Sequence, residues 1–139
     1  TGALFDMGAG EVAVSDTIGI AHPGQVHAVL DTIAAAMRLD AVALHFHDTR
    51  GTALVNVYAA LEHGITVFDS AAGGLGGCPY APGAAGNLAT EDLLFMLDGL
   101  AIHTGIDRTK VAAASRTLEP KLGHPLPSRV LRAPAFPTT

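Results

Sequence analysis

The amino-acid sequence predicts an α/β fold built from parallel β/α units. Three short apolar segments of strand-like composition alternate with segments whose apolar residues recur at helical spacing. The strand-like segments are nearly continuous apolar runs, which is typical of parallel strands covered on both faces. Each of the three ends in polar residues, so the carboxyl edge of the sheet is the expected place for chemistry.

The first two predicted units each combine a strand with a helix. A strand over residues 11–15 precedes a helix that begins at Pro23, a residue favoured in the first turn. The apolar positions of that helix are Val26, Val29, Leu30, Ile33 and Met37. A second strand over residues 41–47 precedes a helix that ends at Gly64, a glycine C-cap. The apolar face of this second helix is predicted to consist of Leu54, Val57, Tyr58 and Leu61.

The third predicted unit contains a long glycine-rich connection. A strand over residues 65–69 leads into the segment 73–87, GGLGGCPYAPGAAGN. Thr90 is the predicted N-cap of the next helix, and the acidic residues that follow it complement the helix dipole. This helix is expected to end near Gly105.

The C-terminal part of the chain is predicted to contain one more helix and a tail. The helix is expected over residues 107–118. Residues 125–139 hold several prolines and are interpreted as an extended or disordered end. We therefore divide the chain into a folded part, residues 1–124, and a proline-containing tail, residues 125–139.

The composition limits the classes of function. Hydrophobic residues make up 49% and charged residues 15% of the 139 residues, which predicts a core that continues into a partner or into missing chain. The net charge of −5 without a basic cluster argues against binding to nucleic acid or to an anionic membrane. A single cysteine suits a reducing compartment, taken here as the cytoplasm. Because the sequence lacks an initiator methionine, we expect it to be a piece of a longer protein.

Two histidines at the end of the second strand form the main candidate site. His45 and His47 are two residues apart, so both imidazoles point to the same face of the strand. Two neutral imidazoles in this arrangement can share one metal ion, and the alternative is a hydrogen-bonded pair that lines a packed interior. Asp16, at the end of the first strand, is a metal ligand, a general base or an Asx-turn residue.

The glycine-rich segment carries the only cysteine of the chain, Cys78. The segment lacks the Lys-Ser/Thr pair of a phosphate-binding loop, so a mobile lid is the favoured interpretation. Spacing does not decide whether Cys78 acts as a nucleophile, as an acid or as a bystander. The other histidines are interpreted as surface or structural residues: His22, His27, His63, His103 and His124.

Several strings resemble the C-terminal portion of 3-hydroxy-3-methylglutaryl-CoA lyases. They are DTIG at residues 16–19, HFHDT at 45–49, VFDS at 67–70, GLGGCPY at 74–80 and GNLATED at 86–92. The string GLGGCPY is the most specific, and the resemblance extends from about Ser15 to the neighbourhood of Arg132. It implies that the chain forms the C-terminal part of a (β/α)8 TIM barrel, which typically needs about 250 residues.

The resemblance also implies roles for individual residues. His45, His47 and Asn87 would be ligands of a divalent cation, Mg²⁺ or Mn²⁺. Cys78, Asp16 and His45 would be catalytic residues. Substrate-binding roles fall on Thr17, Gly77 and Glu91, and Glu91 has a second possible role in ordering the loop near Asn87. An aspartate ligand and an arginine that belong to the family's first strand are absent from this sequence.

The implied reaction is the cleavage of 3-hydroxy-3-methylglutaryl-CoA to acetyl-CoA and acetoacetate. The partners implied are a small acyl-CoA substrate, the missing N-terminal half of the barrel and further copies of the complete chain in a homo-oligomer. The chain alone is expected to be inactive and to associate or aggregate. The alternatives are a related metal-dependent Claisen or aldol enzyme of the same barrel class, acting on an acyl-CoA or a 2-oxo acid, and a non-catalytic barrel fragment.

Overall fold

The structure, a computed structural model, describes residues 2–76 and 86–133 of the chain. Within these residues, three parallel strands form one sheet in the order β1-β2-β3. The strands are β1 (Val12–Asp16), β2 (Val42–Phe46) and β3 (Val67–Phe68). This confirms the predicted α/β fold with parallel β/α units, although β3 is shorter than the predicted strand.

The two faces of β2 have different roles. Val42, Leu44 and Phe46 are buried against the helices, and they alternate with Ala43 and His45 on the opposite face. β1 pairs with β2 in register, with Val12 opposite Val42 and Ser15 opposite His45. Among the described residues β1 pairs only with β2, so its outer edge is open.

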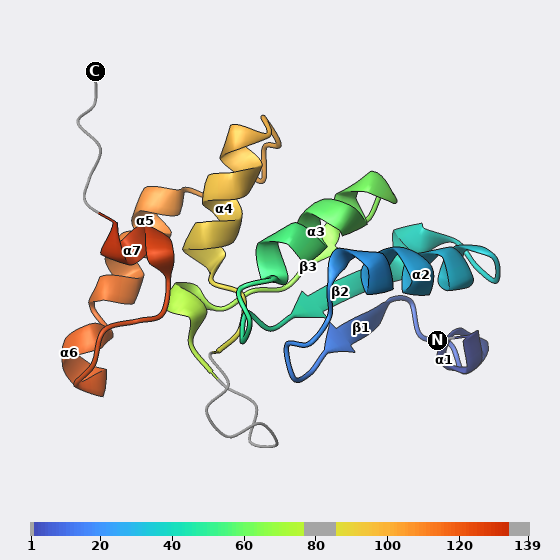
Figure 1. Cartoon of the computed structure of the whole chain (residues 1–139), viewed down its shortest axis with the longest axis horizontal. Coiled ribbons are helices and arrows are strands. Elements are labelled where there is room, and N and C mark those ends of the chain that lie inside the picture. The colour runs from blue at the N-terminus through green and yellow to red at the C-terminus, as the bar shows by residue number, and fades with distance from the viewer. Residues whose placement is uncertain (1, 77–85, 134–139) are drawn as a thin grey trace.

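Three helices cover one face of the sheet. They are α2 (Pro23–Ala34), α3 (Ala53–Glu62) and α4 (Thr90–Gly99), and they follow one another along the sheet (Figure 1). The core between helices and sheet includes Val26, Leu30, Ile33, Leu44, Phe46, Val57, Leu93 and Leu97.

The predicted apolar faces of α2 and α3 are partly wrong. Val29 and Tyr58, expected in the core, are 45% and 48% exposed. On α3 the small residues Ala53 and Ala60 are fully buried instead. Small side chains allow the helix backbone to approach the sheet closely, so the contact face of α3 includes the alanines beside Val57 and leaves Tyr58 outside.

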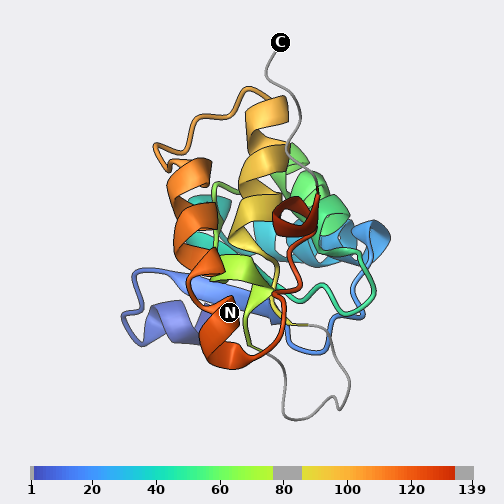
Figure 2. The ribbon, with the colours of Figure 1, turned by 90° about the vertical axis from the view of Figure 1, so that its left-hand side faces the viewer.

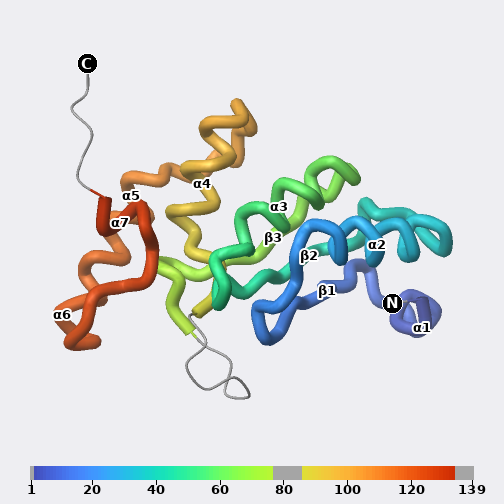
Figure 3. The backbone as a smooth tube through the Cα atoms, in the orientation of Figure 1, coloured from blue at the N-terminus to red at the C-terminus, as the bar shows by residue number. Residues whose placement is uncertain are grey.

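Short helical segments connect the main elements. α1 (Gly2–Asp6) precedes β1 (Figure 3). η1 (Leu39–Ala41) precedes β2, and η2 (Ala72–Gly74) follows β3. None of the three was predicted from the sequence. The predicted glycine end of α3 is confirmed, because Gly64 follows the C-cap His63 and has φ +80°, the left-handed conformation that favours glycine.

The boundaries of the C-terminal helices differ in detail from the prediction. α4 ends at Gly99, earlier than expected, and its N-cap is Ala89 instead of Thr90. The Thr90 hydroxyl contacts the Ser70 hydroxyl at 2.8 Å, so it ties the helix to the end of β3. The next helix, α5 (Arg108–Arg116), agrees with the prediction, and Asp107 caps it by accepting hydrogen bonds from two backbone amides.

The prediction of an extended or disordered tail from residue 125 is wrong for its described part. After α6 (Glu119–Leu122) the chain turns back to α4 and forms α7 (Arg129–Arg132) (Figure 2). Leu126 and Leu131 are buried, so the segment supplies apolar residues to the fold. Leu126 packs on Gly73, where a β-carbon would lie 2.4 Å from the Leu126 Cδ1 atom. The prolines of this segment therefore did not make its described part disordered.

None of the described helices is both long enough and apolar enough to cross a membrane.

Candidate functional site

The two histidines of the predicted site lie together at the carboxyl end of β2, His45 in the strand and His47 just after it. The ring centroids of His45 and His47 are 5.0 Å apart, and the rings meet edge to face. They lie on the face of the strand opposite the helices. Ser15, which sequence reasoning did not single out, is paired in register with His45 and therefore lies on the same face.

His47 is buried and has an unsatisfied nitrogen. Its side chain belongs to a residue that is only 6% exposed, and its Nδ1 atom has no hydrogen-bond partner among the described residues. Burial lowers the pKa of the His47 imidazole, and the nearby His45 lowers it further, whereas Asp16 and Asp69 act in the opposite direction. The ring is therefore held neutral, the form that binds metal ions.

Asn87 lies next to His47, as a shared ligand role requires. Residues 86–88 run antiparallel to the extension of β2, with Asn87 opposite His47. Backbone hydrogen bonds on either side fix this pairing, from Leu88 N to Phe46 O at 3.1 Å and from Asp48 N to Gly86 O at 3.2 Å. The Asn87 Nδ2 atom donates to Leu75 O at 2.9 Å, which orients the side-chain amide.

A glycine at position 86 is required for Asn87 to lie opposite His47. A β-carbon at Gly86 would lie 2.1 Å from the carbonyl oxygens of both Gly74 and Gly76, so any side chain would push Gly86 away from these two residues. The glycines at the base of the connection thus allow Asn87 to reach His47.

Asp69 is a site residue that the sequence did not reveal. Its carboxylate accepts a hydrogen bond from the His45 Nδ1 atom. This contact fixes the tautomer of His45 and leaves its Nε2 atom with a free lone pair. The only sequence signal was the position of Asp69 at the end of the third strand, where it shares the carboxyl edge with His45.

A divalent cation fits these residues in part. Two neutral imidazoles and an amide oxygen are suitable ligands, and the unpaired His47 Nδ1 atom is otherwise a costly buried group. The described residues contain no group of three or more His, Cys, Asp or Glu side chains suited to a metal. Among the described residues the candidate ligands are therefore these three, and water or other groups would complete the coordination shell.

The structure favours the turn interpretation of Asp16. Its two carboxylate oxygens accept hydrogen bonds from Ile20 N at 3.0 Å and Ala21 N at 3.1 Å. These bonds close the loop between β1 and α2. A role of Asp16 in proton transfer stays a prediction.

Glu91 lies inside the protein, which favours loop ordering over substrate contact. The residue is fully buried, and one carboxylate oxygen accepts a hydrogen bond from Gly73 N at 2.8 Å. The other oxygen accepts from the Ser115 hydroxyl at 2.5 Å. Glu91 thus joins α4, η2 and α5, and the substrate-binding role predicted for it stays a prediction.

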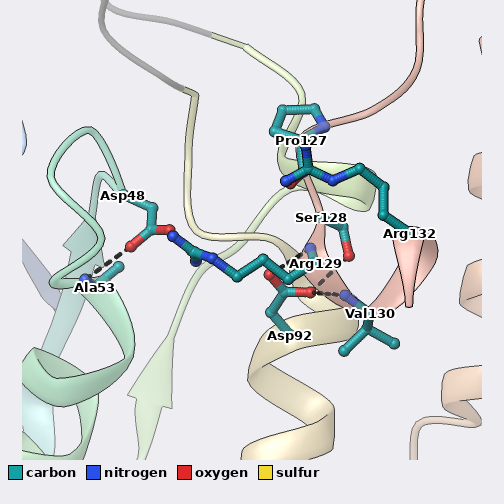
Figure 4. Close-up of polar contacts among 8 residues, drawn as sticks. All are labelled: Asp48, Ala53, Asp92, Pro127, Ser128, Arg129, Val130 and Arg132. Atoms are coloured by element: carbon teal, nitrogen blue, oxygen red, sulfur yellow. Dashed lines mark hydrogen bonds and ion pairs between the residues drawn. The ribbon is translucent and has the colours of Figure 1, made fainter. Parts of the chain in front are cut away.

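A second carboxylate of α4 anchors the C-terminal segment (Figure 4). Asp92 accepts hydrogen bonds from the Ser128 hydroxyl at 2.6 Å, Arg129 N at 3.0 Å and Val130 N at 2.9 Å. The Arg129 guanidinium then donates to Asp48 at 2.7 Å, and the other Asp48 oxygen accepts from the backbone at the start of α3. The Asp48 contact raises the pKa of Arg129.

This network borders a pocket next to Asn87. The pocket has a volume of about 240 Å³, and its polar lining residues include Asp48, Asn87, Asp92, Arg129 and Arg132. The C-terminal segment therefore contributes to the same edge of the sheet as His47, which the prediction of a disordered tail did not anticipate.

Three of the predicted site residues remain without structural support. Thr17 follows β1 and is exposed. Gly77 and Cys78 lie outside the described residues, so their predicted roles stay predictions.

Comparisons with known proteins agree on one family. A family model described as HMGL-like matches residues 1–118. The hydroxymethylglutaryl-CoA lyase YngG of Bacillus subtilis is 54% identical over 130 residues, which are 94% of this chain and 44% of that protein. The (R)-citramalyl-CoA lyase of Chloroflexus aurantiacus is 48% identical over 133 residues, 95% of this chain and 42% of that protein.

A solved structure agrees with the fold. An HMG-CoA lyase from Acinetobacter baumannii, in complex with coenzyme A and 3-methylmalate, superimposes with a TM-score of 0.89 at 42% identity. The superposition covers 97% of this chain and 44% of that chain. The chain thus spans less than half the length of the relatives that it matches.

Proposed function

Since the chain belongs to the HMGL-like family, we propose that it is the C-terminal, site-bearing part of a metal-dependent carbon–carbon lyase. The proposed reaction cleaves 3-hydroxy-3-methylglutaryl-CoA to acetyl-CoA and acetoacetate. The observation that carries the proposal is the convergence of His45, His47 and Asn87, with an unpaired buried Nδ1 atom on His47. The proposed substrate is supported by the similarity to proteins named hydroxymethylglutaryl-CoA lyase, such as YngG.

An acyl-CoA suits the surroundings of the histidines. The pocket beside Asn87 is lined by Asp92, by the Asp48–Arg129 ion pair and by Arg132, so Arg132 is the guanidinium group that would complement an anionic substrate. One similar solved structure holds coenzyme A, which supports the same class of ligand.

The reaction requires a proton to leave the tertiary hydroxyl and a proton to reach the departing carbon. A bound Mg²⁺ or Mn²⁺ would supply Lewis acidity toward the substrate oxygens. His47 and Asn87, with the Nε2 atom of His45, would hold the cation, and Asp69 keeps the His45 ring in the required tautomer. Asp16 or a histidine would take the hydroxyl proton.

Bond cleavage then follows from this deprotonation. As the hydroxyl carbon becomes the ketone of acetoacetate, the electron pair of the broken C–C bond passes to the acetyl-CoA fragment as an enolate. The thiol of Cys78 would donate the proton that the enolate carbon needs. The glycine-rich segment that carries Cys78 joins the described residues at Gly76 and Gly86, adjacent to Asn87.

The same proposal includes partners within a larger protein. We expect the other strands of a TIM barrel to pair with the open edge of β1, and the complete protein to form a homo-oligomer. The chain alone would then lack a carboxylate ligand and the family's arginine, and we expect it to be inactive.

The experiment is an assay of the full-length protein that contains this chain. With Mg²⁺ or Mn²⁺ present, the wild type is expected to release acetoacetate from 3-hydroxy-3-methylglutaryl-CoA. His47→Gln is expected to lose cation affinity and activity together, whereas Cys78→Ala is expected to lose turnover and keep the cation. Normal cation binding by His47→Gln, or full activity after alkylation of Cys78, would contradict the assigned roles.

A related acyl-CoA lyase is the second candidate function. The observation that favours it is the similarity to an (R)-citramalyl-CoA lyase, which is 48% identical. A direct comparison of kcat/KM for the two acyl-CoA substrates separates the candidates. A higher value for citramalyl-CoA would replace the proposed substrate and leave the site assignments intact.

A further inference from the structure

Two histidines meet between α2 and α3, on the side of the sheet away from the candidate site. His27 lies on α2, and His63 follows α3 directly. Their facing ring nitrogens, Nδ1 of His27 and Nε2 of His63, are 2.8 Å apart, and the ring centroids are 5.0 Å apart. Because α2 and α3 cover the face of β2 opposite His45, this pair is separate from the candidate active site.

The outer nitrogen of each ring faces a carboxylate. His27 Nε2 lies 3.7 Å from Glu62 Oε2, and His63 Nδ1 lies 3.8 Å from Asp31 Oδ1. Histidines that bind metals commonly direct their second N–H toward a carboxylate, which fixes the tautomer and makes the ligating nitrogen more basic. At 2.8 Å one of the two facing nitrogens donates a hydrogen bond to the other. A metal ion would take the place of this shared proton, with both outer nitrogens then protonated and facing their carboxylates.

We propose that His27 and His63 form a binding site for a divalent transition-metal ion of the Zn²⁺ or Ni²⁺ class. Imidazole is a preferred ligand of these ions, whereas Mg²⁺ prefers oxygen. In tetrahedral geometry two nitrogens about 2.05 Å from Zn²⁺ lie about 3.3 Å apart, so the observed pair must open by about half an ångström. The His27 side chain is 40% exposed, which leaves room for this movement.

Two imidazoles are the protein ligands of this site. Among the described residues no group of three or more His, Cys, Asp or Glu side chains is arranged to hold a metal, so water completes the coordination. Such a site is accessible and of modest affinity, and it would cross-link α2 to α3. Metal binding is therefore expected to raise the thermal midpoint of unfolding, because only the folded chain holds the two rings together.

The experiment measures Zn²⁺ binding to the full-length protein after removal of metals with EDTA. Calorimetric titrations with Zn²⁺ are run on the wild type and on His47→Gln, so that Zn²⁺ bound at the candidate active site is separated from Zn²⁺ bound at His27 and His63. We expect His27→Gln and His63→Gln each to weaken one class of Zn²⁺ sites at least tenfold and to remove the Zn²⁺-dependent rise of the thermal midpoint. The matched control His103→Gln, an exposed histidine beyond α4, is expected to bind like the wild type.

The carboxylates provide a second test that spares the ligands. Asp31 and Glu62 have exposed side chains, 74% and 56%, so Asp31→Asn and Glu62→Gln leave the fold intact. Each is expected to weaken Zn²⁺ binding about tenfold through its histidine. Wild-type affinity in His63→Gln, or Zn²⁺ binding that is lost only in His47→Gln, would overturn the proposal and leave His27 and His63 as a hydrogen-bonded pair.

Discussion

Asp92 is predicted to hold the C-terminal segment in place. The residue is 5% exposed and accepts three hydrogen bonds, from the Ser128 hydroxyl and from the backbone amides of Arg129 and Val130. Asp92→Ala would leave the buried Ser128 hydroxyl and two amides without their acceptor. Each hydrogen bond to a charged group contributes about 1.5–3 kcal/mol, but the three are not additive, so we expect a loss of about 3–5 kcal/mol.

Two further variants provide values with which the loss of stability in Asp92→Ala can be compared. Asp92→Asn keeps the shape and one acceptor oxygen, so we expect it to cost about half as much. Asp98→Asn is the matched control on the same helix, because Asp98 is exposed and makes only a surface ion pair with Arg108. Such surface pairs contribute about 0–1 kcal/mol.

Urea unfolding of the full-length protein would measure the global effect, and hydrogen exchange of the amides at residues 126–132 would measure the local one. We expect the destabilisation to fall in the order Asp92→Ala, Asp92→Asn, Asp98→Asn. Exchange at residues 126–132 should accelerate in the Asp92 variants before the rest of the fold opens. If Asp92→Ala matched Asp98→Asn in both measurements, the anchoring role would be refuted.

Three further predictions concern single residues. Asp69→Asn should lower both cation affinity and kcat/KM by about 10–100-fold, because the His45 tautomer is no longer fixed, and Ser70→Ala is its control. Because burial lowers the pKa of His47, its contribution to stability is present above the unfolded pKa of about 6.5 and is lost as the pH falls toward its folded pKa. His47→Gln should flatten this part of the pH–stability curve, and an unchanged curve would contradict the assignment. Gly73→Ala should lower the thermal midpoint, whereas Gly99→Ala, where a β-carbon meets nothing within 4 Å, should not.

Much of the fold was predictable because strand and helix periods are local properties of the sequence. The three parallel strands, the helix starting at Pro23 and the helix after Asp107 all appear close to where the pattern placed them. The buried face of α3 was less predictable. Burial of Ala53 and Ala60 depends on how closely the helix approaches the sheet, and that distance is set by both surfaces together.

The candidate site likewise has one part that the sequence predicted and one part that it did not. A two-residue spacing on a strand sufficed to place His45 and His47 on one face, since this is fixed by strand geometry. The contact between Asp69 and His45 spans 24 residues, and the anchoring of Arg129 by Asp92 spans 37. Long-range contacts of this kind have no periodic signature in the sequence.

By itself the sequence determined the parallel β/α architecture, the paired histidines and, through its glycine-rich strings, the resemblance to a lyase family. Only the tertiary structure decided that Asp69 orients His45, that Asp16 and Glu91 bond to backbone and to buried groups, and that the C-terminal segment packs on α4. The physical reason is that hydrogen-bonding side chains choose partners by distance in space, and the packing of helices on the sheet sets those distances.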